Sequence, residues 1–482
     1  MTTTETRYRN DLFIGGDWLP GRRSERIEVV NPSDESVITT VADASVEDAV
    51  TAVDAAAGAL PTWSAVPPRQ RAEILRQAFE LMVERGEELA YLISLENGKS
   101  LADAHSEVSY AAEFFRWYSE EAVRILGEVS LAPSGANRIL VQHQAIGVCL
   151  LVTPWNFPAA MATRKIAPAL AAGCTTVLKP ATATPLAAYA IADILAEAGV
   201  PAGAVNVVTT STSSAVIGHL LHDPRVRKLS FTGSTEVGRV LLREAADQVL
   251  KCSMELGGNA PFIVLEDADL QMALDGIMIA KMRNGGQACT AANRIYVHSS
   301  VHDRFANMIA DKFAELTIGP GTDPATQCGP LVDRPSVEKV TELVNDARER
   351  GADVLVGGKS PSRTGTYYLP TVLANVSRLA RLTSEEIFGP VAALIPFDDT
   401  EEAIAAANDT EYGLSAYVYS GDLASGLRVA EKLESGMVAV NRGLVSDPAA
   451  PFGGVKQSGL GREGAHHGLL EFTEAKYIAV DW

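Results

Sequence analysis

The sequence is short of positive charge. It has 41 Lys and Arg residues against 60 Asp and Glu, which gives a formal net charge of −19 and an isoelectric point near 4.9. Nucleic acids and anionic membranes attract surplus lysine and arginine. The charge balance therefore argues against both partners, and an anionic ligand would need a local group of positive residues.

The chain also has few cysteines. They are odd in number, widely spaced and lack a CxxC pair, and the five are Cys149, Cys174, Cys252, Cys289 and Cys328. This pattern predicts neither a disulfide framework nor a metal site. It fits a reducing compartment, so we expect a cytoplasmic protein.

Long apolar runs are missing as well. The uncharged run 139–163, counting His143 as neutral, is interrupted by Pro154, Asn156 and Pro158, so we expect no membrane span. The N-terminus lacks the apolar segment of a signal peptide. At 482 residues and 47% apolar content, the chain suits a folded protein of two or three domains.

Two regions alternate short apolar runs with helical patterns. In the first, the runs 145–153 and 175–178 alternate with helical patterns at 159–172 and 185–198, and the series continues to residue 255. The second region runs from 260 to about 439. Strands alternating with helices of this length predict an α/β fold with parallel sheets and a potential nucleotide site.

Two segments break this alternation and are predicted to be extended arms. They are 123–141 and the C-terminal 460–482, which is extended from 471 onward. The tail carries an apolar stretch at 477–480, where a free end is usually polar. Pairing with another subunit explains such a strand better than solvent exposure, so we expect a homo-oligomer, either a dimer or a tetramer.

Two short segments suggest an enzyme. Cys289 follows a glycine-rich, uncharged approach, and Glu255 is followed by Leu256 and two glycines. Small residues beside a thiol allow close approach of backbone and substrate, as a nucleophile requires. Each segment alone is weak, because a lone cysteine is more often a small buried hydrophobic residue and a lone glutamate is usually on the surface.

Seven motifs in fixed order strengthen this interpretation: TPWNFP at 153–158, LKP at 178–180, FTGSTEVG at 231–238, ELGG at 255–258, GQAC at 286–289, EIFGP at 386–390 and PFGG at 451–454. Together they resemble the aldehyde dehydrogenase superfamily over nearly the whole chain. The resemblance implies a Rossmann-type cofactor domain (1–122 and 142–256), an α/β catalytic domain (257–440), and a β-arm for oligomerisation (123–141 and 460–482).

The resemblance also implies catalytic roles. Cys289 would attack the aldehyde and form a thiohemiacetal. The side chain of Asn156 and the backbone N–H of Cys289 would stabilise the oxyanion. Glu255 would activate the water that hydrolyses the later thioester. Branches that transfer the acyl group to coenzyme A lack this glutamate, so Glu255 favours a free carboxylate product.

The resemblance implies a dinucleotide cofactor. The glycine-rich segment 233–238 opens a predicted helix, where backbone N–H groups can bind a pyrophosphate. Lys179 would reach the adenosine ribose and Glu386 the nicotinamide ribose. NAD-preferring relatives often carry a glutamate where this chain has Thr182, so we expect NADP to be preferred, with use of NAD left open. The implied cofactor-binding residues are Thr153, Pro154, Trp155, Lys179, Thr182, Gly233, Ser234, Leu256, Glu386 and Phe388.

Within the superfamily, the chain is most similar to the succinate-semialdehyde dehydrogenase branch. The matching residues for a substrate carboxylate are Arg164, Arg283 and Ser446. Asp447 would repel a carboxylate if it faced inward, whereas Arg442 could extend the basic group, so glutarate semialdehyde stays an alternative. A non-catalytic nucleotide-binding protein on the same fold is the alternative from another class.

Overall fold

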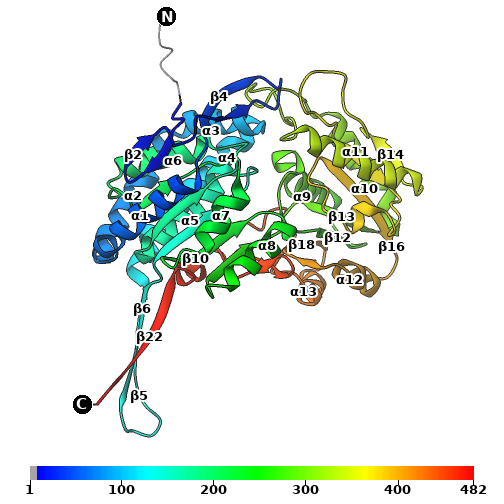
Figure 1. Cartoon of the computed structure of the whole chain (residues 1–482). Coiled ribbons are helices and arrows are strands. Elements are labelled where there is room, and N and C mark those ends of the chain that lie inside the picture. The colour runs from blue at the N-terminus through cyan, green and yellow to red at the C-terminus, as the bar shows by residue number, and fades with distance from the viewer. Residues whose placement is uncertain (1–7, 482) are drawn as a thin grey trace, which may run out of the picture.

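The computed structural model describes residues 8–481, which form two sheet-centred domains and a protruding arm (Figure 1). The first sheet has eight strands in the order β2-β1-β9-β8-β7-β10-β11-β21. Its strands are β1 (Leu12–Ile14), β2 (Asp17–Leu19), β7 (Val148–Val152), β8 (Thr175–Lys179), β9 (Val205–Val207), β10 (Val226–Thr232), β11 (Lys251–Glu255) and β21 (Gly459–Leu460).

The five central strands of this sheet, from β9 to β11, run parallel. All five residues of β7 are buried, as expected for a strand covered on both faces. The strand order reverses between β7 and β10, and ligands of open α/β sheets bind at the carboxyl ends of strands at such a point. The segments 153–158 and 233–238 both begin there.

Helices cover the first sheet in two layers. Directly on the strands pack α1 (Val46–Ser64), α5 (Pro158–Ala172), α6 (Leu186–Glu197), α7 (Ser213–Leu221) and α8 (Thr235–Ala246). Outside α5 and α6 lie α2 (Pro68–Glu84), α3 (Gly86–Asn97) and α4 (Leu101–Glu121), followed by the short η1 (Ala122–Arg124). Helix α5 begins with a proline and ends at Gly173, whose φ of +91° suits glycine.

The second sheet has seven strands in the order β14-β15-β16-β13-β12-β18-β19, parallel except for β14. These are β12 (Ala260–Val264), β13 (Ala292–His298), β14 (Asp353–Val356), β15 (Thr371–Ala374), β16 (Val391–Phe397), β18 (Ser415–Tyr419) and β19 (Met437–Val440). Its helices are α9 (Leu270–Met282), η2 (Arg283–Gly286), α10 (Ser299–Ala314), α11 (Arg334–Glu349), η3 (Arg381–Thr383), α12 (Thr400–Asn408) and α13 (Leu423–Lys432). The α/β prediction is confirmed.

Two small two-stranded sheets and one short helix complete the body. They are β3 (Arg26–Val30) with β4 (Val37–Ala42), β17 (Tyr412–Gly413) with β20 (Val455–Lys456), and α14 (Ala465–Leu470). Among residues 8–481, no helix combines the length and apolar character that crossing a bilayer requires.

The arm is a three-stranded antiparallel sheet in the order β22-β6-β5, and it extends away from the body (Figure 1). Its strands are β5 (Glu128–Leu131), β6 (Arg138–Ala145) and β22 (Thr473–Val480). All four residues of β5 are exposed.

The structure corrects three details of the expected arm. The C-terminal strand pairs along one edge with β6 of its own chain, from Thr473 opposite Ala145 to Val480 opposite Arg138, and its other edge is the edge of the arm sheet. Residues 460–470 belong to the body, because β21 pairs with β11 and α14 packs against α5. Strand β6 also carries the arm on to Ala145, four residues past the expected end.

Candidate active site

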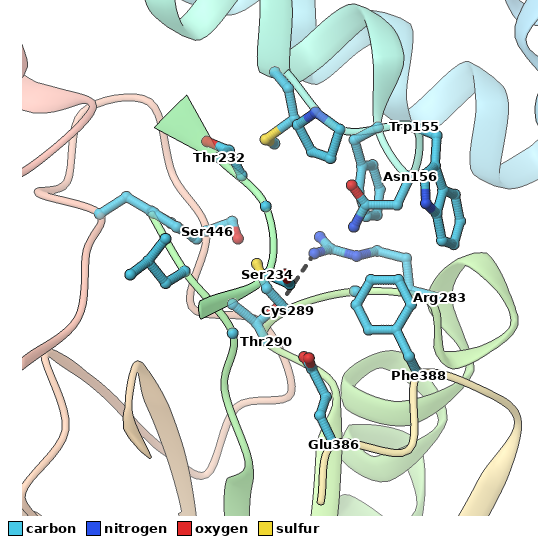
Figure 2. A pocket seen from close by; sticks show the side chains of 18 of the residues that line it. Trp155, Asn156, Thr232, Ser234, Arg283, Cys289, Thr290, Glu386, Phe388 and Ser446 are labelled. Carbon is cyan, nitrogen blue, oxygen red and sulfur yellow. Dashed lines mark hydrogen bonds between the residues drawn. The ribbon is translucent and has the colours of Figure 1, made fainter. Parts of the chain in front are cut away.

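A cavity of about 290 Å³ lies where loops from both domains meet (Figure 2). The first domain contributes the segment after β7, the segment after β10 and Leu256 after β11. The second domain contributes the loop after α9 and the loop before β16. Among its lining residues are Pro154, Trp155, Asn156, Arg164, Gly233, Ser234, Leu256, Arg283, Cys289, Glu386, Phe388 and Ser446. The cavity thus gathers most of the residues singled out in the sequence.

The loop that carries Cys289 has an unusual backbone. Asn284, Gly285 and Gly286 all have left-handed φ values, of 52°, 58° and 78°. A side chain at Gly286 would lie 2.2 Å from the carbonyl oxygen of Gly389, so this residue must be glycine. The turn leads the chain from η2 into the cavity, where Cys289 is half-buried.

The segment after Glu255 meets the Cys289 loop closely. A Cβ at Gly258 would lie 2.7 Å from the carbonyl oxygen of Cys289. The two motifs that first suggested an enzyme are therefore in contact, although 34 positions separate Glu255 and Cys289 in the numbering.

Asn156 faces the cavity from the first domain. Its side-chain nitrogen donates to the carbonyl of Gln287 at 3.1 Å, and its side-chain oxygen is buried without a hydrogen-bond partner. Figure 2 shows Asn156 and Cys289 on facing sides of the cavity. An amide beside the nucleophile can donate to an oxygen that gains negative charge.

Glu255 ends β11 but does not line the cavity. It is 3% exposed, and one of its carboxylate oxygens has no hydrogen-bond partner. Burial, followed by the nearby negative charge of Glu463, raises the pKa of Glu255 well above its ordinary value. In this arrangement the carboxyl group holds its proton at pH values where a surface glutamate is ionised.

Burial also raises the pKa of the Cys289 thiol, to about 12. The cationic Arg164 acts in the opposite direction, and the carboxyl groups of Glu386 and Glu255 raise the pKa further. The Cys289 thiol is therefore protonated at neutral pH. It needs a base or a change in its surroundings to become a thiolate.

Arg164 is not a free guanidinium. Its Nε lies 2.7 Å from a carboxylate oxygen of Glu463, and the neighbouring Lys165 pairs with the other oxygen. The guanidinium also lies 4.1 Å above the ring of Phe452. Glu463 was absent from the residues expected at the site, because no local motif marks a residue that far along the chain from Arg164.

Arg283 is differently placed. Its guanidinium lies 3.5 Å from the hydroxyl of Thr290 and 5.0 Å from the ring centre of Phe157. Among the described residues it makes no ion pair with a carboxylate, and Figure 2 shows it reaching into the cavity. This arginine retains its full charge for a ligand.

The loop 442–447 presents Ser446 and turns its two charged residues away. Ser446 lines the cavity, whereas Arg442 and Asp447 are exposed and do not. Arg442 donates to the carbonyl of Leu444, and Asp447 accepts from the backbone N–H of Ala449. Asp447 therefore does not oppose an anion in the cavity.

Several lining residues were missed by the sequence reasoning. Tyr110, Phe157, Met161 and Phe452 surround the two arginines. The hydroxyl of Tyr110 lies 3.4 Å from Arg164. Only the motif positions of Phe157 and Phe452 offered a signal, and Tyr110 comes from α4, which contains none of the quoted motifs.

The expected cofactor residues fall into two groups. Pro154, Trp155, Gly233, Ser234, Leu256, Glu386 and Phe388 line the cavity, whereas Thr153, Lys179 and Thr182 do not. Thr153 is buried and its backbone N–H donates to the carbonyl of Lys179. Thr182 lines a second cavity of about 430 Å³ with Glu35, Glu96 and Arg334.

These residues fit a dinucleotide. The amine of Lys179 is at the end of β8, and its side chain makes no hydrogen bond or ion pair among residues 8–481. Burial lowers the pKa of this unpaired amine to about 8, so an anionic ligand would restore its charge. Burial raises the pKa of Glu386 to about 7. The part of the chain that the structure describes contains no cluster of three or more His, Cys, Asp or Glu side chains suited to a metal ion.

Comparison with known proteins identifies the class. The family model described as "Aldehyde dehydrogenase family" matches residues 18–478, and the chain belongs to this family. It is an NAD(P)-type aldehyde dehydrogenase by fold and site, and the resemblance seen in the sequence is confirmed.

Particular relatives narrow the comparison. The chain is 53% identical to a succinate-semialdehyde dehydrogenase of Paenarthrobacter nicotinovorans, over 92% of this chain and 99% of that protein. It is 48% identical to a glutarate-semialdehyde dehydrogenase of Pseudomonas putida, over 98% of each chain. A crystal structure described as an Escherichia coli NADP-dependent enzyme superposes with a TM-score of 0.97 at 48% identity, covering 98% of both chains.

The raised pKa of Cys289 predicts how its reactivity depends on pH. Since the fraction of thiolate below its pKa rises tenfold per unit, inactivation by iodoacetamide should accelerate ~10-fold per pH unit between pH 7 and 9 in the cofactor-free enzyme. Inactivation half-times at a fixed reagent concentration measure this. Mass spectrometry of Cys289→Ser reports labelling of the other cysteines, and a rate that is flat across this range would contradict the raised pKa.

Proposed function

We propose that this enzyme oxidises succinate semialdehyde to succinate, with NADP preferred over NAD. The observation that carries the proposal is the cavity itself, which places Cys289 and Asn156 beside Arg164, Arg283 and Ser446. Relatives named for succinate semialdehyde and for an NADP-dependent enzyme support it.

The first chemical step joins Cys289 to the aldehyde. The thiol first gives up its proton to solvent. The sulfur then bonds to the carbonyl carbon, the C=O π bond breaks, and the carbonyl oxygen becomes an oxyanion. Asn156 would donate its amide N–H to that oxygen, together with the backbone N–H of Cys289. The side-chain nitrogen of Asn156 carries two N–H groups, and the carbonyl of Gln287 takes only one of them, so the other is available to the oxyanion.

The cofactor would be held by residues of both domains. Ser234 caps the N-terminus of α8, where backbone N–H groups favour a pyrophosphate, and Lys179 and Glu386 would bind the two riboses. When bound, the nicotinamide would supply the acceptor for the hydride that leaves the thiohemiacetal carbon. Cys289 then carries a thioester.

Glu255 would complete the reaction. As a base, it would take a proton from the water that attacks the thioester, releasing the carboxylic acid and the Cys289 thiolate. Its carboxyl group must first lose its own proton and turn toward the cavity to do so. Gly453 leaves room beside it, because a Cβ there would lie 2.9 Å from the Glu255 carboxylate. The presence of this base disfavours acyl transfer to coenzyme A, and an intact Cys289, Glu255 and Asn156 disfavour a non-catalytic protein.

Glutarate semialdehyde is the second candidate substrate, because a relative 48% identical over 98% of each chain is named for it. Both aldehydes end in a carboxylate, so both suit the arginines. Arg283 is the stronger anchor of the two, because among the described residues it has no carboxylate partner, whereas Arg164 shares Glu463 with Lys165.

The carboxylate anchor can be tested with two aldehydes. Arg283→Ala should lower kcat/KM for succinate semialdehyde ~10-fold or more, because a charge-assisted bond contributes about 1.5–3 kcal/mol, and it should spare butyraldehyde. Arg164→Ala should act in the same direction. Initial rates of NADPH and NADH formation measure both.

Arg442→Ala is the matched control, because this arginine lies in the same loop as Ser446 but is exposed outside the cavity. It should leave both rates unchanged. A wild-type enzyme that prefers butyraldehyde would overturn the substrate assignment and leave the family membership intact, and glutarate semialdehyde as the best substrate would select the second candidate.

The NADP preference rests on Thr182. Its hydroxyl could donate to a 2′-phosphate, where a glutamate would repel it. Four acidic residues line the same cavity: Glu28, Glu35, Glu96 and Asp333. Two of them oppose an anion weakly, because Glu35 is paired with Arg334 and burial raises the pKa of Glu96 to about 8.

Thr182→Glu should therefore lower kcat/KM for NADP ~10-fold or more and spare NAD, since a carboxylate replaces a charge-assisted hydrogen bond with repulsion. Thr182→Gln adds similar bulk without charge and serves as the control. Equal losses with NADP and NAD in Thr182→Glu would contradict this role for Thr182.

The arm and the cysteines carry the remaining proposals. The first sheet with its helices, within residues 8–122 and 146–256 and including β21, forms the cofactor domain, residues 257–440 form the catalytic domain, and the arm joins subunits into a homo-oligomer. The exposed Val129 and Leu131 of β5 support the last point, because exposed apolar edge strands invite pairing. Five unpaired cysteines support a cytoplasmic location.

The paired substitutions Val129→Lys and Leu131→Lys should reduce the oligomer to smaller species, because two charges would be buried at the interface. Light scattering coupled to size-exclusion chromatography measures the mass. Glu128→Lys, on the same exposed strand, changes charge without removing apolar surface and is the control. An unchanged mass would place the interface elsewhere.

A further inference from the structure

Helix α4 presents three charged residues toward the two loops of the active site. Lys99 lies just before the helix, and Asp103 and Glu107 follow at intervals of four residues, so all three share one face. Lys99 and Glu107 are 1% and 2% exposed and pair with each other. We call these three residues the α4 stripe. None of them lines the cavity.

Lys99 holds the Asn156 segment. Its amine donates to the backbone carbonyl of Asn156 at 2.7 Å and lies 4.0 Å from the ring centre of Phe157, the next residue. The carbonyl it binds belongs to the same residue whose amide would stabilise the oxyanion. A shift of this amine would therefore move Asn156.

Glu107 holds the start of the next helix. One carboxylate oxygen pairs with Lys99, and the other accepts the backbone N–H groups of Ala159 and Ala160, at 2.9 and 3.2 Å. These N–H groups belong to the first turn of α5, which begins two residues after Asn156. The segment 156–158 is thus fixed at both ends by one ion pair.

Asp103 holds the other loop. Its carboxylate accepts the backbone N–H of Asn284 at 3.0 Å, at the left-handed turn that leads to Cys289. The side chain of Asn284 then donates to the carbonyl of Asn156 at 2.8 Å. The α4 stripe therefore reaches the nucleophile loop from the first domain and connects it to the oxyanion loop.

The free energy of folding alone does not explain this arrangement. Burying an ion pair costs desolvation, and apolar side chains of similar size in its place are often as stabilising or more so. Left-handed backbone at a non-glycine residue such as Asn284 also persists only where its surroundings enforce it. The buried charges make directional hydrogen bonds to both loops and so fix their positions, which apolar packing cannot do.

We propose that the α4 stripe is the positioning device that keeps Asn156 and Cys289 in register, so that the oxyanion donor and the nucleophile meet the same carbonyl group. Its residues act through the two loops and touch neither substrate nor cofactor. The inference rests on the proposed roles of Asn156 and Cys289.

The test separates position from folding by counting working sites. Lys99→Met removes the donor to Asn156, and Glu107→Gln keeps an acceptor for α5 while weakening the ion pair, so it also serves if Lys99→Met does not fold. The rate of the pre-steady-state NADPH burst, divided by its amplitude, gives the rate per active site, with whichever aldehyde the wild type uses best. The iodoacetamide reaction is measured in parallel, because alkylation of Cys289 requires no oxyanion donor.

A displacement of ~1 Å can cost ~100-fold in rate, so the burst rate per site should fall ~10- to 100-fold in Lys99→Met and Glu107→Gln. Alkylation of Cys289 should stay within ~3-fold of wild type, since the thiol's own ionisation is what sets it. Asp103→Ala should slow both reactions, because it releases the nucleophile loop.

Lys228→Met is the matched control. Lys228 is equally buried and its amine donates to Ser253 at 2.6 Å, at the far end of β10 from the cavity. It should lower the melting temperature and leave the burst rate per site unchanged. If the α4 stripe had only a structural role, its variants would also lower the melting temperature and leave the burst rate per site unchanged.

Burst rates per site within ~3-fold of wild type in both Lys99→Met and Glu107→Gln would overturn the inference, since a removed or misplaced oxyanion donor costs ~100-fold or more. Asn156→Ala tells this failure from that of the proposed mechanism. If Asn156→Ala slows the burst and the stripe variants do not, only the stripe's role is lost. If Asn156→Ala also leaves the burst unchanged, both proposals fall.

Discussion

One backbone carbonyl joins the two domains at the site of chemistry. The carbonyl oxygen of Asn156 accepts from Lys99 in the first domain and from Asn284 in the second. A carbonyl has two lone pairs, and here each domain uses one of them. The contact sits between the loop after β7 and the loop after α9, so the relative position of the sheets is fixed where it matters most. The cavity lies where the two separately folded sheets meet at this contact.

Charge and burial pull against each other throughout the site. The protein carries a net charge of −19, yet its ligands are expected to be anionic. The cavity answers this locally: Arg164 and Lys165 share Glu463, which leaves one surplus positive charge, and Arg283 adds another. Burial meanwhile favours neutral forms, and it raises the pKa values of both Cys289 and Glu386. The apolar walls strengthen electrostatic attraction in the cavity. By the same burial they raise the pKa values of these acidic groups, so that each ionises only at a higher pH.

The sequence predicted the features that depend on residues close together in the chain. Alternating apolar runs located β7, α5, β8 and α6 within a few residues, because burial imposes their periodicity, whereas the second region was predicted only as an alternating stretch from 260 to about 439. The motifs located Cys289 and Asn156 in one cavity. The partner of Arg164 escaped, since Glu463 lies almost 300 positions away and only the folded chain brings them together. The sequence also did not predict the outward direction of Asp447, because no periodicity encodes which way a loop turns. It did not predict the α4 stripe, because its contacts join segments that only the folded chain brings together.

The arm sheet is completed only when the end of the chain has been synthesised. Its middle strand, β6, is made early, but its edge partner β22 begins only at Thr473. A nascent chain can fold much of its first domain while β6 still lacks this neighbour, and domains fold largely as they emerge. The arm sheet becomes whole only after residue 480 has been translated. Chains that stop before β22 would thus display an unfinished arm sheet, on a molecule whose cavity residues up to Phe452 are already present.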